Sequence, residues 1–227
     1  MAPRTVDRFF RTLAVEFKES AAILVTGASA ASLWGSLPPR QDLNFEIRLS
    51  GNHTSSWERF RSAIARTSQQ TGIHARYAED IDRWSGLALL DRRRPALHRK
   101  FSTLSVRLLE PVDWSVGKLG RSSGGDAMDV VQVFKRTRVS APAAVRVWGK
   151  ALKESQASGA LPQFQSQVEA FLRAHGRTIW GKIFDAEAAI ARFQRAAGVT
   201  ALPVKAARSA AASKPSAKLP LRLPEHV

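Results

Sequence analysis

Alternation of apolar and polar positions predicts a β-strand over residues 42–49, whose sequence is DLNFEIRL. With a period of two, one face of this strand carries Leu43, Phe45, Ile47 and Leu49, and the other carries Asp42, Asn44, Glu46 and Arg48. A second alternating run at 104–109 predicts another strand. Residues 73–78 are a further candidate strand. The apolar run at 21–26 is followed by Gly27 and by small residues. This pattern fits either a strand followed by a turn and a helix, or a phosphate-binding turn.

Apolar spacings of three and four residues predict helices elsewhere. Residues 5–19 carry Phe9, Leu13 and Phe17 on one face, and a capping-box spacing from Ser55 to Glu58 begins a helix that runs to about Gly72. Beyond Pro111 the chain becomes mostly helical, with helices predicted at 113–119, 126–134, 143–153, 162–174 and 185–197. The basic, unpatterned stretch 91–100 is predicted to be a loop.

These elements predict an α/β fold, in which a small mixed sheet with flanking helices is followed by a helical C-terminal region. The predicted domains are a core at 1–135, a helical region at 136–200 and a basic tail at 201–227. The tail is rich in Ala, Lys, Pro and Ser and has no apolar periodicity, so it is expected to be disordered.

The composition excludes several kinds of chemistry. The chain has 227 residues and no cysteine, which rules out disulfides, thiolate metal sites and cysteine nucleophiles. Its five histidines have no close-paired spacing, so a histidine metal site is not expected. No apolar run approaches the roughly 18 residues of a membrane-spanning helix, and no leader is evident at the start. We therefore expect a cytoplasmic protein without membrane insertion.

Charge points to the kind of partner. The chain has 35 Lys and Arg against 19 Asp and Glu, a formal net charge of +16, which attracts polyanions. The predicted partner is therefore macromolecular, either an acidic protein surface or a nucleic acid. Candidate contact residues are Arg92, Arg93, Arg94, Arg99 and Lys100, although such a run is also typical of a solvated loop.

Two familiar motifs fail around Gly27. The run VTGAS lacks the further glycines of a dinucleotide-binding turn, and Tyr77 has no lysine four residues later, as a short-chain dehydrogenase requires. The overlapping run GASAA, from Gly27 to Ala31, has alanine at its last position, where a hydrolase nucleophile elbow has glycine. Neither an oxidoreductase nor a hydrolase is indicated.

A wider pattern resembles the nucleotidyltransferase superfamily. The small-residue turn from Gly27 to Gly35 precedes the strand of Asp42 and Asn44. The strand at 104–109, a helix ending in Lys118 and a helix containing Asp126 and Asp129 then follow in the order of that superfamily. The blocks cover residues 20–135 and are similar to the minimal nucleotidyltransferases of toxin–antitoxin and abortive-infection systems.

The resemblance implies two metal ions bridged by carboxylates, with a triphosphate held by the glycine-containing turn. It assigns the catalytic positions to Asp42, Asn44 and Glu46, of which Asp42 and Glu46 are metal ligands. It assigns nucleotide binding to Gly27, Ala28, Ser29, Arg40 and Lys118. Glu79 or Asp80 is the candidate for a third metal ligand.

The site departs from the pattern at Ala28, where a second glycine is expected, and at Asn44, where a second carboxylate is expected. Asparagine is neutral and a weaker ligand for Mg²⁺ than a carboxylate. The alternative for Asp42, Asn44 and Glu46 is the polar face of an edge strand, and for Lys118, Asp126 and Asp129 it is a salt bridge at a helix end.

Three functions remain open. The leading hypothesis is a catalytically degenerate nucleotidyltransferase-like protein that acts by binding and uses no cofactor. The resemblance suggests a plasmid- or phage-linked regulator or inhibitor, such as a factor that interferes with conjugation. The alternatives are an active toxin-type enzyme that modifies tRNA or protein with Mg²⁺ and a nucleoside triphosphate, and a basic nucleic-acid-binding module.

Overall fold

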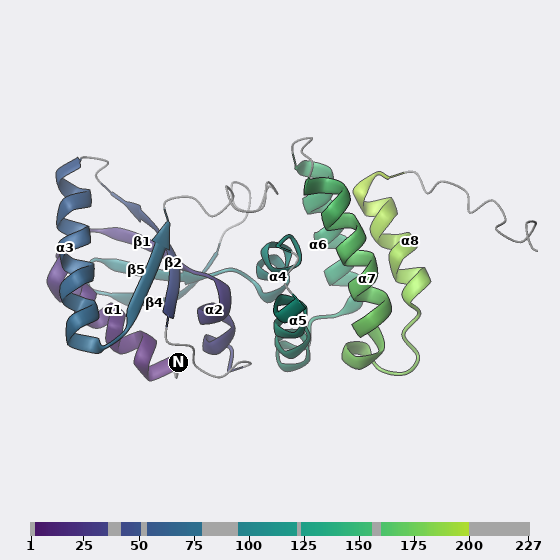
Figure 1. Cartoon of the computed structure of the whole chain (residues 1–227), viewed down its shortest axis with the longest axis horizontal. Coiled ribbons are helices and arrows are strands. Elements are labelled where there is room, and N and C mark those ends of the chain that lie inside the picture. Colours follow the sequence, from purple (N-terminus) through teal and green to yellow (C-terminus); the bar gives the residue numbers. More distant parts are fainter. Residues whose placement is uncertain are drawn as a thin grey trace, which may run out of the picture.

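A mixed β-sheet occupies the first half of the chain (Figure 1). The computed structural model describes residues 3–35, 42–50, 54–78, 95–121, 124–155 and 160–199, and the five strands in these residues form one sheet in the order β3-β2-β1-β5-β4. The strands are β1 (Ala21–Val25), β2 (Asp42–Leu49), β3 (His74–Ala78), β4 (Ala96–Phe101) and β5 (Leu104–Leu108). The predicted α/β class and mixed sheet are confirmed.

The sheet combines two parallel and two antiparallel strand pairs. β1 pairs antiparallel with β2 and parallel with β5, while β3 is parallel to β2 and β4 is antiparallel to β5. The β2–β3 register sets Asp42 opposite His74 and Asn44 opposite Arg76. Paired residues of neighbouring strands share a face of the sheet, so this register decides which side chains meet the polar face of β2.

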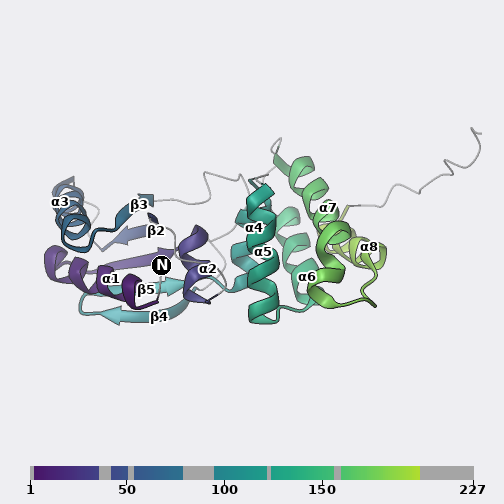
Figure 2. The same cartoon turned by 60° about the horizontal axis from the view of Figure 1, so that its bottom comes forward.

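Helices α1 (Pro3–Phe17) and α3 (Thr54–Thr71) cover one face of the sheet (Figure 2). On this side Leu43, Phe45 and Ile47 of β2 are buried. The ring of Phe45 lies 5.7 Å from that of Phe10 on α1 and 5.9 Å from that of Tyr77 on β3, measured between centroids. The apolar face predicted for residues 42–49 is therefore the core face.

The second half of the chain is helical, as predicted. Its helices are α4 (Pro111–Leu119), α5 (Gly124–Thr137), α6 (Ala141–Glu154), α7 (Ala160–Trp180) and α8 (Ala186–Ala197). A Cβ atom at Gly149 would lie 2.5 Å from the Cβ of Ala196, so glycine lets α6 and α8 approach closely. Trp148 stacks on Phe134 with centroids 5.8 Å apart and ties α6 to α5, and both residues belong to the same hydrophobic core cluster as the sheet residues.

The prediction of a loop at residues 91–100 is wrong for the part that the structure describes, because residues 96–101 form β4. Five of these six residues are exposed, since β4 lies at the edge of the sheet and pairs with β5 alone. An exposed edge strand with charged side chains has no apolar alternation to reveal it. Residues 91–94 and the predicted tail at 201–227 lie outside the described residues.

Within the described ranges, no helix combines the length and the apolar character that crossing a membrane requires.

Candidate functional site

The turn that follows β1 is built around Gly27 and Ser29. Gly27 has φ +57°, a left-handed backbone that glycine adopts without steric cost, and it begins the short helix α2 (Gly27–Leu33). Just before it, the backbone N–H of Thr26 donates to the carbonyl of Asn44 at 3.0 Å. The turn therefore packs directly against β2, with space for an ordinary Cβ at Gly27 about 3.5 Å from the Asn44 side chain.

Ser29 is buried and its hydroxyl is used within the protein. The hydroxyl donates to the backbone carbonyl of Asp42 at 3.2 Å and accepts the backbone N–H of Asn44 at 2.9 Å. A serine hydroxyl has one proton to donate. Because that proton is donated to β2, Ser29 holds the α2 turn to the strand. A phosphate bound at this turn would have to compete with Asp42 for the hydroxyl proton.

The three predicted catalytic residues share the polar face of β2, on the side opposite the α1 and α3 helices. Asp42 and Asn44 are half-buried and Glu46 is buried. Asp42 forms an ion pair with Arg76 of β3, with 3.1 Å between Oδ2 and Nε. Glu46 pairs with Arg48 two residues along the strand, with 3.3 Å between Oε1 and Nε. Each of the two carboxylates therefore faces a guanidinium.

These donors do not fit a bridged pair of magnesium ions. The position between the two carboxylates is the neutral amide of Asn44, and both carboxylates already have a cation of the protein as neighbour. Among the residues that the structure describes, no three His, Asp or Glu side chains gather closely enough to hold a metal ion. The alternative ligands Glu79 and Asp80 lie outside the described residues.

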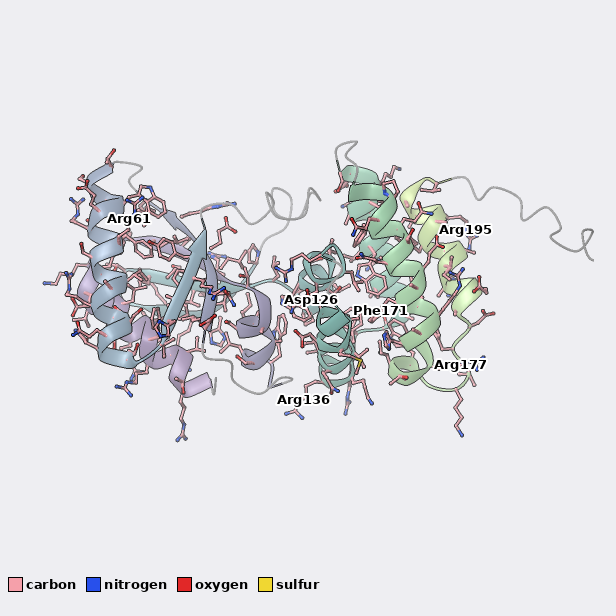
Figure 3. The ribbon with its side chains drawn as sticks, in the orientation of Figure 1. Arg61, Asp126, Arg136, Phe171, Arg177 and Arg195 are labelled. Carbon is pink, nitrogen blue, oxygen red and sulfur yellow. The ribbon has the colours of Figure 1, made fainter. Side chains whose placement is uncertain are left out.

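Lys118 is the cation of a buried ion-pair cluster. Its ammonium lies 2.5 Å from an oxygen of Asp126 and 2.6 Å from an oxygen of Asp129, and only 4% of its side chain is exposed. Arg121 approaches the other oxygen of Asp126 at 3.7 Å. Figure 3 shows Asp126 where α5 begins beside α4. This cluster joins the end of α4 to the start of α5, as the salt-bridge alternative predicted.

Trp114 connects this cluster to the turn at Gly27. The Lys118 ammonium lies 5.5 Å from the centre of the Trp114 ring, and the indole N–H of Trp114 donates to the carbonyl of Gly27 at 2.8 Å. Trp34, at the end of α2, meets the same indole edge-on with centroids 5.5 Å apart. The predicted nucleotide-binding positions Gly27 and Lys118 are therefore close in space, but the side chain of Trp114 lies between them and contacts both.

Of the other predicted site residues, Arg40 and the run from Arg92 to Arg94 lie outside the described residues. Arg99 and Lys100 are described and belong to the edge strand β4. Both line a groove with a cavity volume of about 540 Å³ between α1 and the β4–β5 turn. The two predicted contact residues therefore have a defined surface around them.

The same groove contains functional candidates that sequence reasoning missed. Arg11 lines it from α1 and Lys18 lines it from the position directly after that helix, opposite Arg99 and Lys100. Arg99 also pairs with the carboxylate of Asp7 on α1. Nothing in the sequence indicated that β4 would lie beside α1, so Arg11 and Lys18 could not be connected with Arg99 and Lys100.

Comparisons with known protein families, with curated proteins and with solved structures found no match to this chain.

Proposed function

We propose that this protein is a catalytically degenerate nucleotidyltransferase-like protein, which acts by binding a macromolecular partner. The observation that carries the proposal is the pairing of Asp42 with Arg76 and of Glu46 with Arg48. A two-ion mechanism needs carboxylates that are free to bridge metal ions and accept the charge of a triphosphate. Here the corresponding carboxylates balance arginine side chains of the same sheet.

The use of Ser29 supports the same proposal. Its hydroxyl donates a hydrogen bond to the backbone of Asp42 and accepts one from the backbone of Asn44. These two bonds hold the turn against β2. Lys118 is likewise committed to Asp126 and Asp129. Three features that would serve a nucleotide in a transferase thus have structural partners in this protein.

The fold that the proposal implies is the nucleotidyltransferase core, with its turn, acidic strand and following helices. The setting is the one suggested by the sequence resemblance: a cytoplasmic regulator or inhibitor linked to a plasmid or phage, for example one that interferes with conjugation. The groove between α1 and β4 favours a polyanionic partner, because Arg11, Lys18, Arg99 and Lys100 line it.

Calorimetry with nucleotides tests this proposal. The full chain is titrated with ATP, GTP, CTP and UTP, with and without Mg²⁺, and the titrations are repeated on Asp42→Ala. A binding protein without a working transferase site should show no Mg²⁺-dependent heat that Asp42→Ala removes.

Glu58→Ala is the matched control, because Glu58 is an exposed carboxylate on α3 away from the polar face of β2. Binding that needs Mg²⁺, survives Glu58→Ala and disappears in Asp42→Ala would overturn the proposal in favour of the toxin-type enzyme. Circular dichroism of each variant establishes that it is folded before it is titrated.

A further inference from the structure

The groove between α1 and β4 carries an unbalanced positive charge. The residues that line it are Arg11, Ala14, Val15, Lys18, Arg99, Lys100, Phe101, Ser102 and Thr103. Four of these side chains are cationic and, among these described lining residues, none is acidic. Figure 2 shows α1 running beside β5 and β4, which places the two sources of charge along one surface.

Three of the four cations are available to a ligand. Arg99 pairs with Asp7, so its charge is balanced inside the protein. Arg11, Lys18 and Lys100 are exposed, and none of their side chains forms a hydrogen bond or an ion pair with the residues that the structure describes. Beside the hydrogen bond from Arg66, the charge of Lys18 helps to lower the pKa of the nearby Glu16. Unpaired cations that converge on a groove are a binding surface for anions.

The charge continues along α1 beyond the groove. Arg4 and Arg11 are seven residues apart on α1, which keeps them close to one line on the helix surface, and Lys18 follows directly after the helix ends at Phe17. At about 1.5 Å of rise per residue, Arg4 and Arg11 are separated by roughly 10 Å along the helix axis. A nucleic-acid duplex presents about six phosphate charges over that length of its axis. The spacing therefore suits an extended polyanion and not a single small anion.

The lining favours a duplex over a single strand. Proteins bind single strands by stacking bases on exposed aromatic side chains. Phe101 is the one aromatic residue among the described lining residues, and it is buried. Phosphate contacts instead use Arg, Lys and Ser or Thr side chains, and the exposed polar residues of the lining are Arg, Lys and Ser102.

An acidic protein partner fits the lining less well. Protein interfaces depend on a few apolar or aromatic anchors in desolvated pockets. Among the described lining residues, Val15 is the one exposed large apolar side chain. Apart from Val15, the exposed lining side chains are those of Arg, Lys and Ser residues.

Backbone conformation adds a second feature. Lys18 and Ser102 have φ +58° and +48°, and they are two of the three non-glycine residues with positive φ in the described part of the chain. Both line the groove, one at the end of α1 and one in the β4–β5 turn. Non-glycine residues held in this region cluster at ligand-binding sites.

We propose that the groove between α1 and β4 binds duplex nucleic acid through its phosphate backbone, independently of sequence. Arg11, Lys18 and Lys100 contact phosphates, and Ser102 supplies a neutral hydrogen bond. The inference rests on the proposed function, since it names the macromolecular partner that a binding protein requires.

Fluorescence anisotropy with a labelled 20-base-pair DNA duplex tests the inference on the full chain. The variant Arg11→Glu/Lys100→Glu should bind at least tenfold more weakly than the wild type. The slope of log K against log salt should fall by about two, because two phosphate contacts are lost.

The matched control is Arg61→Glu/Arg192→Glu, which makes the same change in net charge at exposed positions on α3 and α8. Figure 3 labels Arg61 on the outer side of α3. This variant should stay within about threefold of wild type, and cationic segments outside the described residues contribute equally to both variants. Circular dichroism and thermal unfolding show whether each variant is folded.

Each other outcome overturns the inference in a recognisable way. Equal weakening by both variants would mean that overall charge binds the duplex and the groove does not. Tighter binding to the single strand of the same sequence, or to polyglutamate, with loss in the groove variant would assign the groove to another partner. Absence of duplex binding at 100 mM salt would reject the duplex as the partner of the groove. These outcomes do not bear on Mg²⁺-dependent nucleotide binding, so the proposed function is tested separately by the calorimetry.

Discussion

Trp114 donates its indole N–H to the carbonyl oxygen of Gly27, with 2.8 Å between nitrogen and oxygen. The bond spans the junction between the sheet and the helical half, because Gly27 follows β1 and Trp114 lies in the first helix after β5. Trp114 is also buried and holds Trp34 edge-on. One side chain therefore positions the turn where the sequence resemblance expects a triphosphate.

Replacing Trp114 with phenylalanine should reduce the free energy of unfolding by about 1–2 kcal/mol. The change keeps an aromatic ring but removes a buried hydrogen bond, whose loss costs about this much, together with part of the packing. Urea unfolding followed by circular dichroism measures the difference.

Trp57→Phe serves as the control for that measurement. Trp57 is half-buried on α3, and its indole N–H has no hydrogen bond to the described residues. The substitution removes the same atoms without removing such a bond, so it should cost distinctly less. An equal cost at both positions would show that the Gly27 bond contributes nothing.

Lys118→Met should destabilise the fold by about 3 kcal/mol or more. It leaves the carboxylates of Asp126 and Asp129 close together without the buried ammonium between them, and breaking a buried ion pair from one side is costly. Unfolding in urea at pH 7 provides the measurement.

The triple variant Lys118→Met/Asp126→Asn/Asp129→Asn should recover most of that loss, because no uncompensated charge remains. Recovery identifies Lys118 as a structural cation. A single variant as stable as wild type would instead mean that Lys118 is not needed for the fold and is available for a ligand.

Local patterns predicted the elements well. The alternation in residues 42–49 identified both the buried face with Phe45 and the polar face with Glu46, and the pair of Glu46 with Arg48 follows from the same period of two. The helices after Pro111 were found because Gly, Pro and capping residues mark their ends, as Asp185 does for α8.

Long-range relationships could not be predicted in the same way. The pair of Asp42 with Arg76 depends on the parallel register of β2 and β3, and no local signal sets that register. The edge strand β4 was missed because its exposed residues have no apolar periodicity. The groove was missed for the same reason, since it requires α1 and β4 to lie together across about 80 residues of chain.

Ser29→Ala should lower the free energy of unfolding by about 1–3 kcal/mol, because it leaves the N–H of Asn44 and the carbonyl of Asp42 without the hydroxyl that bonds both. Hydrogen exchange at the Asn44 backbone amide should also be faster in this variant than in the wild type. Denaturant unfolding and native-state hydrogen exchange together measure the effect.

Ser32→Ala is the matched control, since Ser32 is equally buried on the same helix but its hydroxyl donates only to the carbonyl of Ser29, within α2 itself. It should cost less than Ser29→Ala and leave exchange at Asn44 unchanged. Similar exchange rates at Asn44 in both variants would contradict the role given to Ser29.

Acid should weaken the contact between α1 and α3. Hydrogen bonds from Arg66 and Gln70 hold the pKa of Glu16 below its ordinary value of 4.5, and a hydrogen bond from Arg59 does the same for the pKa of Glu19. A pKa that is lower in the folded state contributes stability above the unfolded value, and the contribution disappears as pH falls through the folded value.

The variant Glu16→Gln/Glu19→Gln should therefore lose stability at pH 7 and differ less from wild type at pH 3. Both pairs are at the surface, so the difference at pH 7 should also shrink in high salt. Urea unfolding at the two pH values measures this difference. If the gap between the double variant and wild type were as large at pH 3 as at pH 7, the two glutamates would not stabilise the fold through their charges.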